Sequence, residues 1–397
     1  MRLNYLAIKC MKLSNNIQLA YCTNVHRGST WEETFNALEK YVLKVKELVC
    51  PDERFAIGLR LGADAARTLS EPTMLLAFQK WLEQKNCYVF TINGFPYGNF
   101  HGTRVKEQVY RPDWTDPDRL SYTVVLFEIL EKLLNPGEEG SVSTLPASFK
   151  EFHPVGKLPE IALKNISTCA LEIERLQKAK DLDLHLGLEP EPLGSFETTP
   201  ETISFFDQLH NYSGIPELSK SVGVNYDCCH LAIEFENAHF GLSQLMEAGI
   251  RLSKLHLSSA LRAKPTPQNR DLLKSFVEDV YLHQVVVGKN GKAEQRYRDL
   301  DIALQDDIAN SDGDEWRIHF HVPLHASPHG TLGDTQKQVL DTLDWLALNP
   351  NACRHLEMET YTWEVLPKEL QSTSVVKQVA KEYEWTLQAL KERALCQ

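Results

Sequence analysis

The sequence lacks the long apolar runs, basic blocks and paired cysteines that define several classes of protein. No stretch of its 397 residues approaches the ~20 apolar residues that a membrane span requires. No apolar run near the N-terminus has the length of a secretory signal peptide. The nine cysteines are an odd number and include no Cys-x-x-Cys pair, which favours reduced thiols over a disulfide framework. We therefore expect a cytoplasmic protein with no membrane span.

The chain also has no excess of positive charge. It contains 42 lysines and arginines against 54 aspartates and glutamates, which gives a net charge of −12 with histidine neutral. Because proteins bind the phosphate backbone mainly through electrostatics, an acidic chain without a basic block is a poor nucleic-acid binder. Hydrophobic residues make up 43% of the chain, close to the average of globular proteins. We expect a globular protein with no nucleic-acid partner.

Short apolar runs alternate with longer amphipathic segments along the chain. The eight runs interpreted as strands span residues 16–25, 55–62, 87–94, 141–145, 183–192, 222–230, 251–260 and 354–362. The segments interpreted as helices span residues 31–49, 65–85, 117–135, 159–180, 199–211, 239–249, 334–348 and 367–393. Repeated βα units build a parallel sheet, and eight of them close into a barrel. The predicted fold class is therefore α/β, a (β/α)8 TIM barrel, with a doubly wound open sheet as the alternative.

Two segments depart from the regular alternation. Residues 1–10 are interpreted as a non-structural N-terminal extension, followed by a single barrel domain over residues 11–397. A long irregular segment, residues 261–332, follows the seventh predicted strand. Within it, Gly288-Lys-Asn-Gly291 predicts a hairpin, and residues 316–325 predict an added strand. Because the loops that follow barrel strands build the active sites of such folds, we expect this insertion to form an ordered lid.

Acidic and histidine side chains stand at the ends of the last four predicted strands. Glu189 and Glu191 share one side of the fifth strand, because side chains along a strand alternate with a period of two. Asp227, His256 and Glu359 end the next three strands. Carboxylates together with one imidazole suit a divalent cation such as Mn²⁺, Mg²⁺ or Zn²⁺. The pattern predicts a metal site at this rim of the barrel.

Three spaced pairs of polar residues follow one another in this region. They are Glu-x5-Glu at residues 191–197, Asp-x-x-His at residues 227–230 and His-x5-Arg at residues 256–262. These spacings resemble those of ketose 3-epimerases of the xylose isomerase-like barrel superfamily. Glu359 stands where those enzymes place their final metal-binding glutamate. The resemblance covers about residues 190–360 and implies a xylose isomerase-like barrel with a long insertion after strand seven.

Distinctive segments are spread along nearly the full length of the chain, at residues 11–28, 92–114, 140–146, 188–197, 254–262 and 319–323. In these segments the chain also resembles the EboE-type metabolite traffic proteins. The family implies a role in moving secondary-metabolite precursors towards the periplasm, with a small-molecule metabolite as ligand and other proteins of the pathway as partners. It does not imply an established reaction.

The resemblance to the epimerases also implies a role for individual residues. It implies that the metal ligands are Glu191, Asp227, His256 and Glu359. It implies further that Glu191 and Glu359 are the catalytic residues, exchanging protons with the substrate carbon as base and acid. Glu189 is the competing ligand, because it shares a face with Glu191, but the spacing to Glu197 favours Glu191.

Other polar side chains are expected to contact the substrate. By the same resemblance, Glu197, His230 and Arg262 would bind the substrate's oxygens. His319 and His321 alternate onto one face, and we expect them to close the site as part of a lid or to contribute to a second metal. Asn24 and Asn93, near the ends of early strands, are further candidates for the pocket wall.

Two other functions compete with a metal-dependent isomerase or epimerase. One is a carrier or scaffold that keeps the metal pocket and binds a metabolite without converting it. The other is a phosphodiesterase similar to endonuclease IV, because His-Phe-His at residues 319–321 resembles the paired ligands of those enzymes. The net charge of −12 argues against the second.

Overall fold

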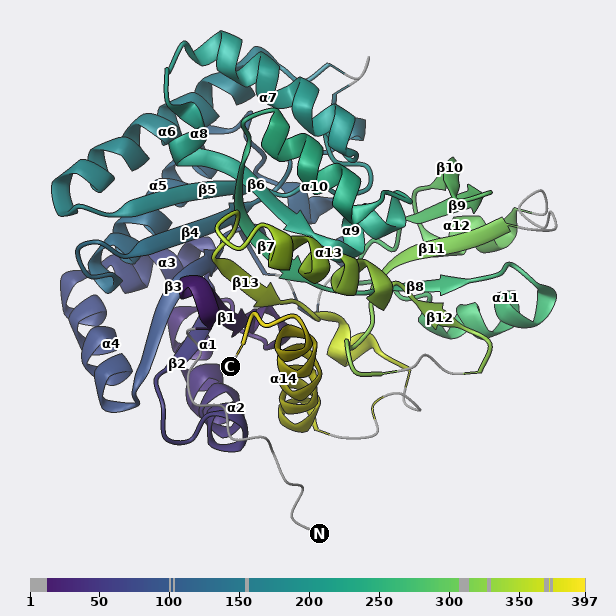
Figure 1. The fold of residues 1–397 in the computed structure, drawn as a ribbon, viewed down its shortest axis with the longest axis horizontal. Helices are drawn as coiled ribbons and strands as arrows, with labels where there is room; N and C mark the ends of the chain where they lie inside the picture. The colour runs from purple at the N-terminus through teal and green to yellow at the C-terminus, as the bar shows by residue number, and fades with distance from the viewer. Residues whose placement is uncertain are drawn as a thin grey trace.

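Eight parallel strands form the central sheet of the computed structural model, which describes residues 13–99, 101–102, 104–153, 157–306, 314–326, 330–367, 371 and 374–396 (Figure 1). These strands are β1 (Gln18–Tyr21), β2 (Phe55–Arg60), β3 (Cys87–Asn93), β4 (Glu139–Thr144), β5 (Asp183–Leu188), β6 (Val222–Asp227), β7 (Arg251–Leu257) and β13 (His355–Met358). Their order is β1-β13-β7-β6-β5-β4-β3-β2. A parallel bridge between Cys22 and Gly58 joins the end of β1 to β2, so the sheet curls into a barrel. The predicted (β/α)8 barrel is confirmed.

Helices surround this barrel on its outer face (Figure 1). The longer ones are α1 (Trp31–Ala37), α2 (Leu43–Val49), α3 (Ala63–Ser70), α4 (Pro72–Gln84), α5 (Pro117–Leu133), α6 (Glu160–Lys180), α7 (Thr199–Ser213), α10 (Ala238–Glu247), α13 (Gln336–Leu348) and α14 (Val375–Glu392). Two short helices, α8 (Leu218–Ser221) and α9 (Cys228–Ile233), flank β6. Strands such as β2, β3 and β6 are buried along their whole length because side chains fill the inside of the barrel and helices cover the outside.

Several predicted strands are shorter in the structure, and three other predicted boundaries change. The predicted helix 65–85 is two helices, separated at Glu71, because the residue before a proline avoids the helical conformation. The predicted sixth strand, 222–230, ends at Asp227, and its last residues form α9. The C-terminal helix begins at Val375 rather than at residue 367. The expected extension, residues 1–10, lies outside the described residues.

The insertion after β7 folds into a second sheet with its own hydrophobic cluster. Its elements are β8 (Ala260–Ala263), α11 (Pro267–Leu273), β9 (Val285–Lys289), β10 (Lys292–Tyr297), α12 (Leu300–Gln305), β11 (Asp314–His321) and β12 (Gly333–Asp334). The predicted hairpin is β9–β10, and its turn places Asn290 and Gly291 at positive φ, 52° and 76°, as a tight hairpin turn requires. The predicted added strand is β11, which pairs with β8 and β9. Trp316 and Ile318 of β11 are buried in the cluster, so the insertion is ordered there.

The inserted sheet lies beside α9, next to the ends of β6 and β7 (Figure 1). This placement brings β11 against the helix that follows β6, at the end of the barrel where the predicted site residues stand. Among the described residues, none of the helices combines the length and the apolar character needed to cross a bilayer.

Candidate metal centre

Four side chains from four neighbouring strand ends converge at one rim of the barrel. Glu189 follows β5, Asp227 ends β6, His256 lies near the end of β7 and Glu359 follows β13. One ligand atom from each of the four lies within 4.8 Å of the others. All four residues are buried. The parallel register places them side by side, with Asp227 opposite His256 in the pairing of β6 with β7.

His256 is the centre of this group. Its Nδ1 atom lies 3.1 Å from Glu189 Oε1, 3.4 Å from Asp227 Oδ2 and 3.3 Å from Glu359 Oε2. Burial lowers the pKa of His256, but the negative charges of Glu359 and Glu189 outweigh it and hold the pKa well above its ordinary value. Three carboxylates facing one ring nitrogen require a positive charge between them, which a proton or a metal ion can supply.

Buried side chains outside the group hold its members in place. The Nε2 atom of His256 lies 2.8 Å from Glu357 Oε2, and this contact leaves Nδ1 to face the carboxylates. The Asn24 and Asn93 amides donate to Glu359 Oε1 at 2.7 and 3.2 Å. Such outer partners commonly fix the orientation of metal ligands.

Two hydrogen bonds hold the Asp227 carboxylate through the oxygen that does not face His256. Its Oδ1 atom accepts hydrogen bonds from the Ser258 hydroxyl at 2.6 Å and from the backbone N–H of His230 at 3.0 Å. The second bond caps the N-terminus of α9, which explains why the chain turns into a helix directly after Asp227. The other carboxylate oxygen, Oδ2, is therefore the one that faces His256.

Glu357 was not among the residues predicted from the sequence, although it supports His256. Glu357 lies on β13, two positions before Glu359, which follows the strand. Because side chains along a strand alternate between its two sides, the position of Glu359 could have identified Glu357. Its Oε2 also accepts a hydrogen bond from Lys254 at 2.5 Å, and both residues are fully buried. A Cβ atom at Gly58 would collide with the Glu357 carboxylate, so a glycine in β2 makes room for this buried charge.

Glu191 lies next to the four-residue group rather than within it. Strand β5 ends at Leu188, so Glu189 continues its alternation into the barrel mouth, whereas Glu191 follows Pro190 in the next loop. A carboxylate oxygen of Glu191 instead lies within 4.8 Å of a ring nitrogen of His230 and of a ring nitrogen of His319. Burial and the negative charge of Glu189 raise the pKa of Glu191 well above its ordinary value. The geometry thus favours Glu189 as the fifth-strand ligand, two residues earlier than the spacing indicated.

The histidines predicted to contact substrate also gather at this rim. His230 on α9 and His319 on β11 approach each other, with their Nε2 atoms 3.0 Å apart. His321 lies on the same strand as His319, and its ring is 5.9 Å from that of His230, centre to centre. Burial lowers the pKa of both His230 and His319, which favours the neutral form of each ring.

Glu197 and Arg262 lie away from this rim. The Glu197 carboxylate forms an ion pair with Lys150 and accepts a hydrogen bond from the Leu193 backbone N–H at 2.8 Å. Arg262 belongs to β8 of the inserted sheet, where its side chain is 48% exposed and 3.3 Å from the Glu315 carboxylate. Neither residue lines the cavity above the four-residue group. Their roles as substrate contacts stay predictions that this arrangement does not favour.

A cavity of about 70 Å³ opens over the four-residue group. Its lining combines carboxamides, carboxylates, histidines and aromatic rings, among them Asn24, Asn93, Phe95, Tyr110, Glu189, Glu191, His230, Tyr281, His319, Glu359 and Tyr361. Oxygen and imidazole donors that converge under such a cavity fit a divalent cation with a position left for substrate. The donor set suits Mn²⁺, Mg²⁺ and Zn²⁺ and does not choose among them.

Comparison with known proteins identifies the fold. No protein-family model matches the chain, and no curated protein matches it in sequence. Among solved structures, it is similar to a xylose isomerase domain protein from Planctomyces limnophilus, with 13% identity, a TM-score of 0.50 and coverage of 89% of this chain and 94% of that one. It is also similar to an L-ribulose 3-epimerase, with 10% identity, a TM-score of 0.51 and coverage of 94% and 95%. These likenesses show that the chain has the TIM-barrel fold of these two structures.

Proposed function

We propose that this protein is a divalent-metal-dependent isomerase or epimerase that moves a proton next to a carbonyl group of a small metabolite. The observation that carries the proposal is the convergence of Glu189, Asp227, His256 and Glu359 at the base of a cavity. The similarity of the fold to an L-ribulose 3-epimerase supports a hydroxy-carbonyl compound as substrate class.

The chain's own residues supply binding and proton transfer in this proposal. Glu189, Asp227, His256 and Glu359 would hold the ion, which when bound polarises a carbonyl and stabilises the negative charge that develops on its oxygen. Burial and the nearby Glu189 carboxylate raise the pKa of Glu191 and so favour its protonated form, and we assign proton donation to it. We assign proton removal to Glu359. Its Oε1 atom accepts hydrogen bonds from the Asn24 and Asn93 amides, which hold the carboxylate in the cavity wall.

The cavity favours an uncharged substrate over a phosphorylated one. Among the described residues that line it, Lys106 is the one lysine or arginine. Its ammonium group already donates to the Asp299 carboxylate at 2.7 Å and to the Glu278 carbonyl oxygen at 2.8 Å. Phosphate binding normally uses free cationic donors. The aromatic rings of Tyr110 and Tyr361 instead offer apolar surface to a carbon skeleton.

The biological setting of the reaction is also a proposal. The sequence resemblance to EboE-type proteins supports a role in metabolite traffic, in which a secondary-metabolite precursor would be the substrate and other proteins of that pathway the partners. A cytoplasmic site of action agrees with the predicted reduced cysteines.

Deuterium exchange tests the proposed reaction. The metal-loaded protein would be incubated in D₂O with a panel of ketoses and related hydroxy-ketones, and deuterium on the carbon next to the carbonyl followed by NMR. We expect at least one compound to exchange, and Glu191→Gln and Glu359→Gln to abolish the exchange. If a compound bound tightly by calorimetry but none exchanged, the protein would be a carrier and the proposed enzyme would be refuted.

A further inference from the structure

The cavity over the four-residue group has a polar lining and an apolar lining. The polar lining contains the carboxylates and amides described above. The apolar lining comes from the segment after β3, from the insertion and from the segment after β13. Its main members are Phe95, Val105, Val109, Tyr281, Leu282 and Tyr361.

Side chains of the apolar lining pack against one another. Val109, Tyr281 and Tyr361 belong to one hydrophobic cluster. The ring centres of Tyr281 and Tyr361 lie 5.1 Å apart with an interplanar angle of 75°, an edge-to-face arrangement that holds both rings in place. Phe95 makes a similar contact with Tyr110, at 5.6 Å between ring centres. The apolar lining therefore offers fixed carbon surface to a bound molecule.

The two phenol hydroxyls of the apolar lining are already engaged with protein groups. His101 Nε2 lies 2.6 Å from the Asn24 carbonyl oxygen, which only accepts, so this nitrogen carries the proton. The Nδ1 atom of His101 is then an acceptor, and the Tyr281 hydroxyl donates to it at 2.6 Å. The Tyr361 hydroxyl faces His319 Nε2 at 3.5 Å.

Backbone groups of the apolar lining are engaged as well. The N–H of Phe95 donates to Asn93 Oδ1 at 3.1 Å, and its carbonyl oxygen accepts from the Arg119 guanidinium at 3.0 Å. The N–H groups of Val105 and Lys106 both donate to the carbonyl oxygen of Val280, at 2.9 Å each. A substrate hydroxyl placed against this lining would lose its bonds to water without gaining equivalent bonds to the protein, which weakens binding.

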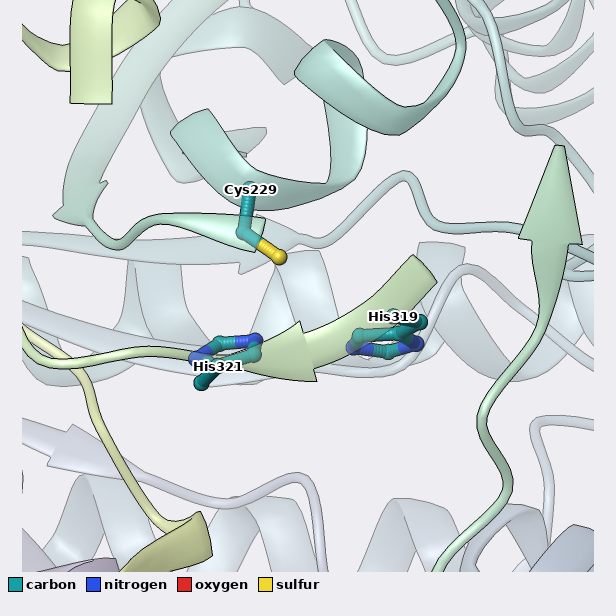
Figure 2. Close-up of side chains that lie close together, drawn as sticks. All are labelled: Cys229, His319 and His321. Atoms are coloured by element: carbon teal, nitrogen blue, oxygen red, sulfur yellow. The ribbon is translucent and has the colours of Figure 1, made fainter. Parts of the chain in front are cut away.

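Packed side chains close the part of the cavity next to α9. Figure 2 shows Cys229 projecting from α9 towards β11, along which His319 and His321 lie. The sulfur of Cys229 and one ring nitrogen of each histidine lie within 4.8 Å of one another. Of these three side chains only His319 lines the cavity, and Cys229 belongs to an apolar cluster with Ile233 and Val286. The carbon chain of a bound molecule therefore cannot extend towards α9.

The unsatisfied polar group that suits a substrate hydroxyl stands beside the four-residue group. The side-chain nitrogen of Asn24 donates to Glu359 Oε1 at 2.7 Å. Its oxygen, Oδ1, is buried and has no hydrogen-bond partner among the described residues. A donor on a bound molecule would satisfy this acceptor, so we expect the hydroxyl groups of the substrate at this end of the cavity.

We propose that the substrate is a hydroxy-ketone whose far end carries no hydroxyl groups, and not a free ketose with a hydroxyl on every carbon. The inference rests on the proposed function, because the four-residue group fixes which end of the molecule reacts. The carbonyl and its neighbouring hydroxyls lie at the four-residue group and Asn24. The alkyl or aryl remainder lies against the apolar lining, where carbon contacts replace hydrogen bonds.

Binding of a matched pair of ketones tests this inference. Isothermal titration calorimetry of the Mn²⁺-loaded protein would compare L-ribulose with its 4,5-dideoxy analogue, which keeps the carbonyl and both flanking hydroxyls. We expect the analogue to bind at least about tenfold more tightly, because neither missing hydroxyl has a partner in the apolar lining. Equal affinities, tighter binding of L-ribulose, or no binding of the analogue would each overturn the proposal.

A polar substitution in the apolar lining should reduce this preference. Val109→Thr keeps the shape of the side chain and adds a hydroxyl that can pair with a substrate hydroxyl, so the ratio of the two affinities should fall at least about threefold. Val277→Thr is the matched control, because Val277 is 40% exposed and does not line the cavity. An unchanged ratio in Val109→Thr would overturn the placement of the far end on this lining.

Deuterium exchange with the same two ketones separates this inference from the proposed function. Preferential binding of the analogue with no exchange of either compound would refute the isomerase or epimerase and leave the ligand class standing. Exchange of L-ribulose together with tighter binding of L-ribulose would support the enzyme and refute the ligand class.

Discussion

His256 and Glu357 are joined inside the barrel, with His256 Nε2 lying 2.8 Å from Glu357 Oε2. Both side chains are fully buried, and Lys254 donates to the same carboxylate oxygen. The contact orients the ring so that Nδ1 points at three carboxylates, and a buried Lys–Glu pair thereby positions a candidate metal ligand.

Replacing Glu357 should weaken metal binding without removing a ligand. Glu357→Gln keeps an acceptor for His256 Nε2 but removes the negative charge that increases the basicity of the ring. Losses of this kind typically lower metal affinity roughly 10–100-fold. Competition with a chelator measures the change, and Glu392→Gln on the exposed side of α14 is the control. An unchanged affinity would show that Glu357 supports the fold alone.

Removing Lys254 should destabilise the protein more than removing an exposed lysine. Lys254→Met leaves Glu357 buried without its cation, which typically costs about 3–5 kcal/mol. Lys178→Met is the matched control, because its ion pair with Glu174 lies on the surface and contributes at most about 1 kcal/mol. Urea unfolding compares the two variants. The double variant Lys254→Met/Glu357→Gln should recover part of the loss, and equal effects of the two lysine variants would contradict the burial argument.

Glu189 and Glu191 should differ in their effect on the metal ion proposed for the four-residue group. Glu189→Gln removes an oxygen from the four-residue group and should reduce its occupancy strongly, whereas Glu191→Gln should leave that ion bound. Elemental analysis of the two purified variants makes the comparison direct. The reverse result would support the ligand that the Glu-x5-Glu spacing indicated.

Arg262 should be dispensable for the proposed metal site. Its exposed side chain pairs with Glu315 on the inserted sheet and does not line the cavity. Arg262→Ala should leave the metal content unchanged and alter the free energy of unfolding by less than about 1 kcal/mol. Deuterium exchange of an accepted substrate should persist in this variant. Its loss, with the metal retained, would return Arg262 to the substrate-binding residues.

Ionisation of Glu382 should lower the free energy of unfolding as the pH rises towards neutrality. This residue of α14 is buried, and its carboxyl group accepts hydrogen bonds from the Leu324 backbone N–H and the Thr360 hydroxyl. Burial raises the pKa of Glu382 to about 7. A raised carboxyl pKa means that the folded state favours the protonated form. Its stabilising contribution is complete below the unfolded pKa of about 4.5 and is lost as the pH rises to about 7.

The variant Glu382→Gln isolates this effect. Because glutamine does not titrate, the free energy of unfolding of the wild type should fall relative to the variant between pH 4.5 and 7, by about 2–4 kcal/mol. Urea unfolding at several pH values gives the difference. A constant difference across this range would show that Glu382 titrates normally.

Local patterns in the sequence were sufficient to predict the barrel and the rim of the site. The alternation of apolar runs with amphipathic segments identified eight βα units. Parallel topology then places the strand ends at which Asp227, His256 and Glu359 lie at one edge of the barrel. The hairpin at Asn290 and Gly291 followed from the backbone conformation that its turn requires.

The sequence by itself therefore determined the fold class and the strand ends that carry acidic and histidine side chains, because strand alternation and the βα repeat are local properties. Only the tertiary structure decided which atoms meet. The point at which β5 ends brought Glu189 rather than Glu191 to His256, and the packing of the inserted sheet against α9 brought His319 to His230. Both outcomes depend on where a strand stops and how distant segments pack, and no local spacing encodes that.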